Sequence, residues 1–306
     1  MRALKVTAIF VVLVIFGGAL LAPLGYWLVQ SLASTGGAME SLGRQPFHRY
    51  VSRAMLLLAL AGLWPWARGM GMVSWRDMGW RRPQAPEWKL LGWGFLWGLA
   101  SLAVFAIVAV ASGAKVANFD HTAGEWVKRL FSATLSGIFV ALLEETLFRG
   151  GVFGGLRRSL GFLPAMLLAS VIFASLHFLD RRPEPVGTVG WGSGIALLPR
   201  MVREIDDVRM FGAALGSLVL VGCFLCLSYE RTGNLFFPVG LHAGWVFWMK
   251  ITGFVTVEQP QAAGWLWGTG KLVDGWVVFG LLLVTFALYW QRGRAAAASG
   301  GMGGNG

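Results

Sequence analysis

Eight long apolar stretches constrain the fold of this chain more than any other feature of its sequence. Each carries few or no charged residues, and a helix of about 20 such residues spans the roughly 30 Å hydrocarbon core of a bilayer. They lie at about residues 6–29, 50–66, 90–112, 130–148, 162–179, 211–229, 235–252 and 276–290. The alternating segments of about ten residues that mark a transmembrane β-barrel do not occur. We therefore predict an all-α fold, a polytopic transmembrane helical bundle with about eight membrane-spanning helices.

The composition supports a membrane location. Hydrophobic residues make up 56% of the chain and charged residues only 13%, whereas roughly 25% of residues are charged in a soluble domain. The net charge of +11 comes from basic residues spread over all the connecting loops. This distribution favours contact with anionic lipid head groups and argues against a nucleic-acid partner. We expect an integral, multi-pass protein of the prokaryotic inner or plasma membrane, with an orientation that the basic residues do not decide.

The chain shows no internal repeat, which predicts one transmembrane domain over residues 1–294 rather than two related halves. The Gly-rich segment 295–306 is predicted to be a disordered tail. The long connection 180–209 contains an apolar patch at residues 195–199 and is expected to hold a short interfacial or re-entrant helix. Cys223 and Cys226 lie inside an apolar stretch and are interpreted as small core residues.

The loop at residues 68–89 combines three tryptophans, Trp75, Trp80 and Trp88, with five basic residues. Tryptophan and basic side chains are enriched where a chain meets the head-group layer of a membrane. We interpret this loop as a membrane anchor.

Ionisable residues inside apolar helices cost at least about 2.5 to 3.5 kcal/mol each, so each needs a partner or a function. Glu144, Glu145 and Arg149 enter the membrane together after an uncharged run that begins at Leu130. Glu145 and Arg149 are four residues apart, share a helical face and are predicted to form an ion pair. Glu144 points about 100° away and has no partner in its own helix.

A buried carboxylate of this kind can accept a proton from water, because desolvation disfavours its charged form. Glu144 is therefore the candidate general base. The alternative is that both glutamates belong only to a packing network around Arg149.

Two histidines stand in neighbouring apolar stretches, His177 near the end of one and His242 four residues after Pro238 in another. The segment from Gly150 to Leu156 is uncharged, so we predict that the preceding helix continues to residues 157 and 158 and buries Arg149 against Glu145. This continuation brings Glu144 and His177 toward the same face of the bilayer. Glycines at positions 150, 151, 154 and 155 would let neighbouring helices approach closely. A loop over these residues is the alternative.

The zinc peptidase signature H-E-x-x-H is absent. Glu144, His177 and His242 could in principle hold zinc with one open position. Neither histidine has a sequence-local carboxylate to orient it, so a glutamate-activated water without a required cofactor is the preferred chemistry.

Three motifs in order resemble the CPBP family, the CAAX prenyl protease and bacteriocin-processing group of intramembrane endopeptidases. They are E-E-x-x-x-R at 144–149, F-x-x-x-H at 173–177, and a histidine at 242 that follows T-G-N-L and a proline. The resemblance covers about residues 130–250. It implies that Glu144 activates the attacking water with help from His177, that Glu145 and Arg149 support the site, and that His242 stabilises the oxyanion.

The chain departs from the family pattern at Val246, where the family usually has Asn or Asp. Loss of one oxyanion donor typically raises the activation energy by about 2.7 to 4 kcal/mol. Asn234 and Trp245 are candidate replacements.

The favoured function is an intramembrane peptidase that hydrolyses a peptide bond of a membrane-embedded or lipidated peptide or protein, in a cavity between the fourth and seventh helices. The alternative is a non-catalytic membrane protein of the same fold, acting as a bacteriocin-immunity or scaffold factor. A proton-coupled transporter is a third hypothesis, disfavoured because the chain lacks repeats.

Overall fold

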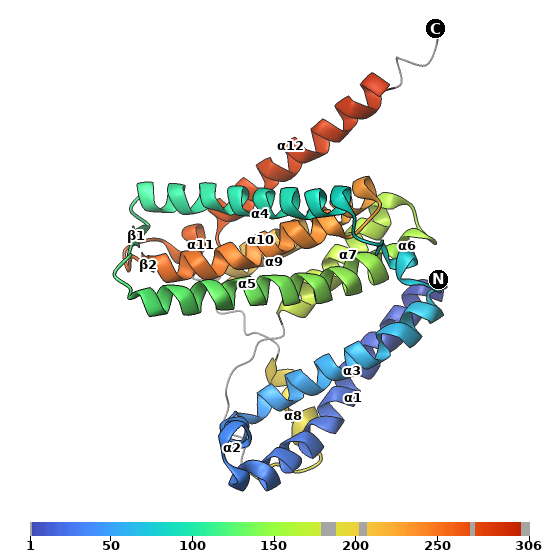
Figure 1. Ribbon diagram of the computed structural model, residues 1–306, viewed down its shortest axis with the longest axis vertical. Coiled ribbons are helices and arrows are strands. Elements are labelled where there is room, and N and C mark those ends of the chain that lie inside the picture. The colour runs from blue at the N-terminus through green and yellow to red at the C-terminus, as the bar shows by residue number, and fades with distance from the viewer. Residues whose placement is uncertain (1, 179–187, 202–206, 270–272, 301–306) are drawn as a thin grey trace. The chain divides into compact units, whose positions relative to one another are not determined.

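The computed structural model describes residues 2–178, 188–201, 207–269 and 273–300, which are almost entirely helical (Figure 1). The helices are α1 (Arg2–Leu32), η1 (Ala33–Thr35), α2 (Gly37–Gly43), α3 (Phe47–Gly69), η2 (Trp75–Met78), α4 (Ala85–Ala111), α5 (Ala123–Glu145), η3 (Thr146–Phe153), α6 (Gly154–Arg157), α7 (Phe162–His177), α8 (Ser193–Met201), α9 (Val208–Thr232), α10 (Phe236–Val255), α11 (Gly264–Trp267) and α12 (Trp276–Gly300). Two short strands, β1 (Lys115–Ala117) and β2 (Thr256–Glu258), pair antiparallel with Val116 opposite Val257. The prediction of an all-α fold is confirmed.

Five of the described helices are long and apolar enough to cross a membrane, which makes this a multi-pass membrane protein. They are Leu4–Leu32, Phe47–Gly69, Ala85–Ala111, Ala123–Arg157 and Val208–Thr232. Phe162–His177 and Trp276–Gln291 are apolar but shorter. Each of the eight predicted stretches coincides with a helix, but the number of about eight spans is not confirmed. The seventh stretch is α10. It is less apolar because it contains Pro238, His242 and Lys250.

The chain divides into two compact units, Met1–Val73 with Leu176–Glu204 and Ser74–Ser175 with Ile205–Gly306. In the first unit α1 packs against α3, and α8 adds Leu197 to their buried core. The apolar patch at residues 195–199 is thus part of a short helix, as predicted. The single domain over residues 1–294 stays a prediction.

Helix α10 is the centre of the second unit and lies between α4 and α5 (Figure 1). A buried cluster joins these helices through Ala141 of α5 and Val239 and Ala243 of α10. Both cysteines of α9 are buried and free, as expected of core residues.

Glycines allow α4 and α10 to approach at backbone distance. Gly94 and Gly98 of α4, like Gly240 and Gly244 of α10, form a G-x-x-x-G pair, a spacing that lets membrane helices pack closely. A Cβ atom at Gly94 would collide with the carbonyl oxygen of Phe237, and one at Gly244 would lie 2.5 Å from the carbonyl oxygen of Phe95. The two helices therefore have no room for side chains along this contact.

Replacing Gly240 with Ala should lower the free energy of unfolding by about 1 to 3 kcal/mol, because the new methyl group would collide with the carbonyl oxygen of Leu91. Gly92→Ala is the control, since no atom lies within 4 Å of its Cβ position. Thermal unfolding of both variants in detergent measures the difference. Equal stability of the two variants would contradict the close packing.

The helix that carries the acidic motif is continuous from Ala123 to Arg157. Thr122 begins it with a capping box, and the segment Thr146–Phe153, toward its C-terminal end, is π-helical. The predicted continuation is confirmed as far as Arg157, and the loop alternative is wrong. Gly150 permits a close approach as predicted, since a Cβ atom there would lie 2.6 Å from the carbonyl oxygen of Met78.

Helix α12 extends into the segment 295–306 for which disorder was predicted. It ends at Gly300, and residues 301–306 lie outside the described residues. Residues 295–298 are all alanine, the residue type with the highest helix propensity, and this favours the extension of the helix.

Candidate functional site

The site begins with a buried ion pair within one helix. Nη1 of Arg149 lies 2.9 Å from Oε1 of Glu145, and the two side chains are 1% and 0% exposed. Removing either charge would leave the other buried without compensation, which is far more costly than breaking an exposed pair. The prediction that Arg149 is buried against Glu145 is confirmed.

His242 of α10 joins this pair from a different helix. Its Nδ1 lies 2.7 Å from Oε1 of Glu145, which also accepts from Arg149. An ionised carboxylate only accepts hydrogen bonds, so Nδ1 of His242 is the donor. Glu145 therefore fixes the orientation and the tautomer of the imidazole, as a carboxylate does for a catalytic histidine.

Glu144 lies on the other side of the same imidazole. Its Oε2 is 3.8 Å from Nε2 of His242, and the side chain is 29% exposed. This distance is too long for a direct hydrogen bond, and Oε2 itself is buried although the side chain as a whole is partly exposed. The two adjacent glutamates thus face the two ring nitrogens of one histidine, with Glu145 at Nδ1 and the partly exposed Glu144 at Nε2.

Phe173 of α7 completes the surroundings of the cluster. The guanidinium carbon of Arg149 lies 4.5 Å from the centre of its ring, a cation–π distance. The ring also meets His242 edge-on at 6.3 Å and Phe148 at 5.1 Å between centroids. The phenylalanine of the F-x-x-x-H motif therefore contacts both the cation and the imidazole of the site.

The variant Phe173→Leu tests this contact in a double-mutant cycle with Arg149→Met. We expect a coupling energy of about 0.5 to 2 kcal/mol, because the cation–π contact forms in a water-poor site. Unfolding of the single and double variants in detergent measures it. Phe139→Leu, at an exposed position of α5, is the control that should show no coupling to Arg149. Additive effects at Phe173 would mean that its ring only fills space.

His177 is the last residue of α7, and its side chain is exposed. It belongs to the first unit, whereas Glu144, Glu145, Arg149 and His242 belong to the second. Its part in the site stays a prediction.

The side chains do not form a recognisable zinc site. Within the described residues, no group of three or more His, Cys, Asp or Glu side chains is arranged to hold a metal ion. Nδ1 of His242 is bonded to Glu145, whereas Nε2 lies 3.8 Å from Glu144, beyond hydrogen-bond distance.

The two candidates for the missing oxyanion donor are engaged elsewhere. The amide nitrogen of Asn234 donates to the carbonyl oxygen of Thr232, and its oxygen accepts from the backbone of Phe236 at the start of α10. Nε1 of Trp245 donates to Ser101 at 2.8 Å. Both side chains therefore already have hydrogen-bond partners, and their part in binding an oxyanion stays a prediction.

Two contacts around the site could not be predicted from the sequence. Phe173 stands in the F-x-x-x-H motif, but the motif does not indicate that its ring contacts Arg149. Trp80 donates from Nε1 to the hydroxyl of Thr146 at 3.1 Å, which ties the loop before α4 to the beginning of the π-helix. A tryptophan among interfacial residues indicates an anchor, so no sequence signal pointed to this contact.

The fold and the site define a helical, multi-pass membrane protein with a buried Glu–Arg–His cluster and a second, partly exposed glutamate beside it. Residues 126–248 match the family model Type II CAAX prenyl endopeptidase Rce1-like, and this segment contains the whole cluster. The resemblance to the CPBP family is thereby confirmed over these residues, and the matched family is one of endopeptidases. Comparison with the curated proteins and with the solved structures gives no match.

Proposed function

We propose that this protein is an intramembrane endopeptidase that uses a water molecule activated by Glu144 to hydrolyse a peptide bond. The observation that carries the proposal is the position of His242 between two adjacent carboxylates, 2.7 Å from Glu145 and 3.8 Å from Glu144. Proton transfer requires a base within reach of the water, and Glu144 is the more exposed of the two carboxylates beside His242. The buried Glu145, which forms an ion pair with Arg149, orients the imidazole of His242.

In the proposed reaction, Glu144 accepts a proton from the water as its oxygen attacks the carbonyl carbon of the scissile bond. The electron pair of the carbonyl moves to its oxygen. This oxygen would receive a hydrogen bond from Nε2 of His242 when the imidazole carries a second proton, because the proton on Nδ1 is already donated to Glu145. When the tetrahedral intermediate collapses, the C–N bond breaks and the proton on Glu144 passes to the leaving amine. The immediate products are a carboxylic acid and an amine, and transfer of the acid's proton to the amine gives a carboxylate and an ammonium group.

The substrate class follows from the location of the site. A cluster carried by α5 and α10, in a chain with several apolar helices, supports a membrane-embedded or lipidated peptide or protein as substrate. The family match points to prenylated proteins as one such class. We also propose that the reaction requires no cofactor and that the protein is located in the prokaryotic inner or plasma membrane. His177 is proposed to assist Glu144, as the resemblance implies.

The second candidate is a non-catalytic immunity or scaffold factor of the same fold. Val246 favours it, because this apolar side chain stands where the family has a hydrogen-bonding residue, and Asn234 and Trp245 are engaged elsewhere. A binding protein would need the buried cluster only for stability.

The deciding experiment incubates the purified protein, in detergent or liposomes, with a library of membrane-tethered and C-terminally lipidated peptides. The wild type is compared with Glu144→Ala and His177→Ala, each with and without a zinc chelator, and products are identified by mass spectrometry. Cleavage by the wild type that both variants lose and that survives chelation is the expected result. Loss of wild-type cleavage when the chelator is added would indicate a metal enzyme. If the folded wild type cleaved no peptide, the binding protein would be favoured.

A further inference from the structure

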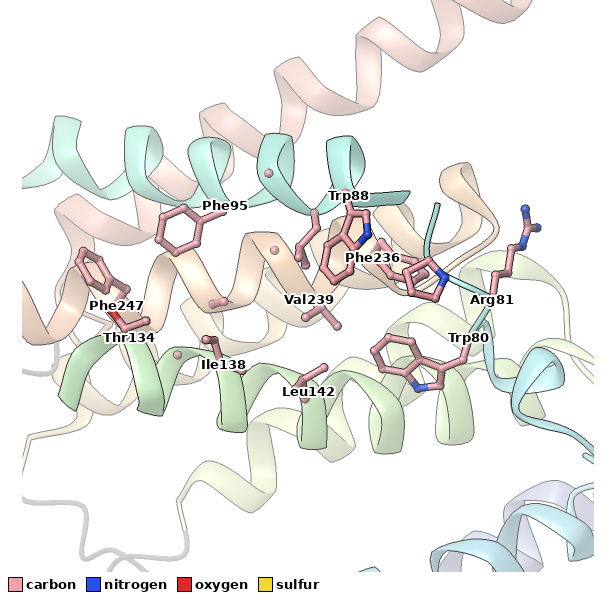
Figure 2. A pocket seen from close by; sticks show the side chains of 16 residues that line it. Trp80, Arg81, Trp88, Phe95, Thr134, Ile138, Leu142, Phe236, Val239 and Phe247 are labelled. Carbon is pink, nitrogen blue, oxygen red and sulfur yellow. The ribbon is translucent and has the colours of Figure 1, made fainter. Parts of the chain in front are cut away.

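An apolar groove of about 640 Å³ lies among α4, α5, α10 and the loop before α4 (Figure 2). Five aromatic side chains line it: Trp80, Trp88, Phe95, Phe236 and Phe247. Its other lining residues are mostly aliphatic or glycine, and none of the four side chains of the Glu–Arg–His cluster is among them. The side chains assigned to the proposed reaction therefore lie outside the lining of this groove.

The groove runs along the helices, which is the direction of a lipid chain in a membrane. Its lining on α5 extends from Thr134 to Leu142, a rise of about 12 Å, and on α10 from Phe236 to Phe247, about 16 Å. In Figure 2 these residues lie one after another along the two helices. An elongated, unbranched hydrocarbon fits this shape better than a compact ligand.

One end of the groove is suited to the membrane surface. Trp80 and Trp88 lie there, and tryptophans of this kind mark the level of the lipid head groups. Arg81 lies at the same end with its guanidinium directed away from the apolar side chains (Figure 2). It is exposed and donates to the carbonyl oxygen of Gly233 at 3.1 Å, and among the described residues no acidic side chain pairs with it. Its remaining donors can therefore bind an anion.

We propose that this groove binds a phospholipid with an anionic head group, with one acyl chain along α5 and α10 and the head group at Arg81. The charge at one end and the apolar lining over the remaining length match the two parts of such a lipid. The Trp-rich loop then has a defined lipid partner rather than a general affinity for the surface.

Gly92 offers a way to fill the groove without disturbing the fold. It lines the groove on α4, and no atom lies within 4 Å of its Cβ position. The variant Gly92→Leu places a side chain in the space that the acyl chain would occupy. Gly280→Leu is the matched control, because Gly280 of α12 has equally open surroundings but does not line the groove.

The test is native mass spectrometry of the delipidated protein titrated with phosphatidylglycerol or phosphatidylcholine of identical acyl chains. We expect one tightly held phosphatidylglycerol on the wild type and on Gly280→Leu, and loss of that lipid on Gly92→Leu. The variant Arg81→Gln should keep chain binding but lose about fivefold of its preference for the anionic lipid, the effect of one basic residue near a head group. Thermal unfolding in detergent verifies that all variants are folded.

Three results would overturn the proposal. They are equal lipid retention by Gly92→Leu and Gly280→Leu, an unchanged head-group preference in Arg81→Gln, and displacement of the lipid by a lipidated peptide at equimolar amounts. The last result would assign the groove to the peptide. Peptidase activity plays no part in the readout, so failure here leaves the proposed reaction standing.

Discussion

The variant Glu144→Gln should reduce kcat for peptide cleavage by about 10² to 10⁴-fold, the contribution typical of a positioned general base. Glutamine preserves the size of the side chain but cannot accept the proton of the attacking water. Because Glu144 is partly exposed and is not a member of the buried Glu145–Arg149 ion pair, stability should change little. Steady-state cleavage of a lipidated peptide, together with thermal unfolding, separates the two effects.

Glu40→Gln is the control for this variant, because Glu40 forms an exposed i,i+4 pair with Arg44 in α2. It should retain full activity. If Glu144→Gln cleaved the peptide at the wild-type rate, Glu144 could not be the base. The non-catalytic hypothesis makes a separate prediction, that the phenotype of cells carrying Glu144→Gln is unchanged.

The variant Arg149→Leu should lower the free energy of unfolding by about 3 to 5 kcal/mol, since it leaves the carboxylate of Glu145 buried without its cation. Replacing both partners, in Glu145→Leu with Arg149→Leu, should recover part of this stability because no unpaired charge then remains in the core. The double variant should still lack activity, because His242 would have lost the acceptor for its Nδ1. Denaturation and cleavage assays measure the two quantities.

The control is Arg44→Leu, which breaks the exposed ion pair of the same spacing. Arg44 is 77% exposed, and an exposed pair contributes little to stability, so unfolding should be nearly unchanged. If Arg149→Leu and Arg44→Leu lost equal amounts of unfolding free energy, burial of the ion pair would not determine how much its removal destabilises the protein. Recovery of cleavage in the double variant would show that Glu145 does not orient His242.

The two partners of Glu145, Arg149 and His242, illustrate what spacing along the sequence can and cannot predict. Glu145 and Arg149 are four residues apart, so helical geometry alone predicted their pairing. Glu145 and His242 are separated by 97 residues, and no local carboxylate was available to orient the histidine. The packing of α10 against α5 supplies that carboxylate, and with it a role for Glu145 that spacing along the chain could not indicate.

The packing of α4 on α10 illustrates the same division. The four glycines of the two G-x-x-x-G pairs are present in the sequence, but a small residue indicates only that some helix can approach. The collisions that a Cβ atom would make at Gly94 and Gly240 identify the partner helix. The choice depends on how both helices pack over their full length.

The sequence by itself determined the helical membrane fold, the continuation of the acidic helix to Arg157, the Glu145–Arg149 pair and the family resemblance. These follow from apolar stretches, helical periodicity and short motifs, all of which act over a few residues or turns. Only the tertiary structure decided that His242 lies between the two glutamates, that Phe173 covers Arg149 and that a separate groove ends at Arg81. Such contacts join residues that are distant along the chain, and they form because helices bury whole faces against one another.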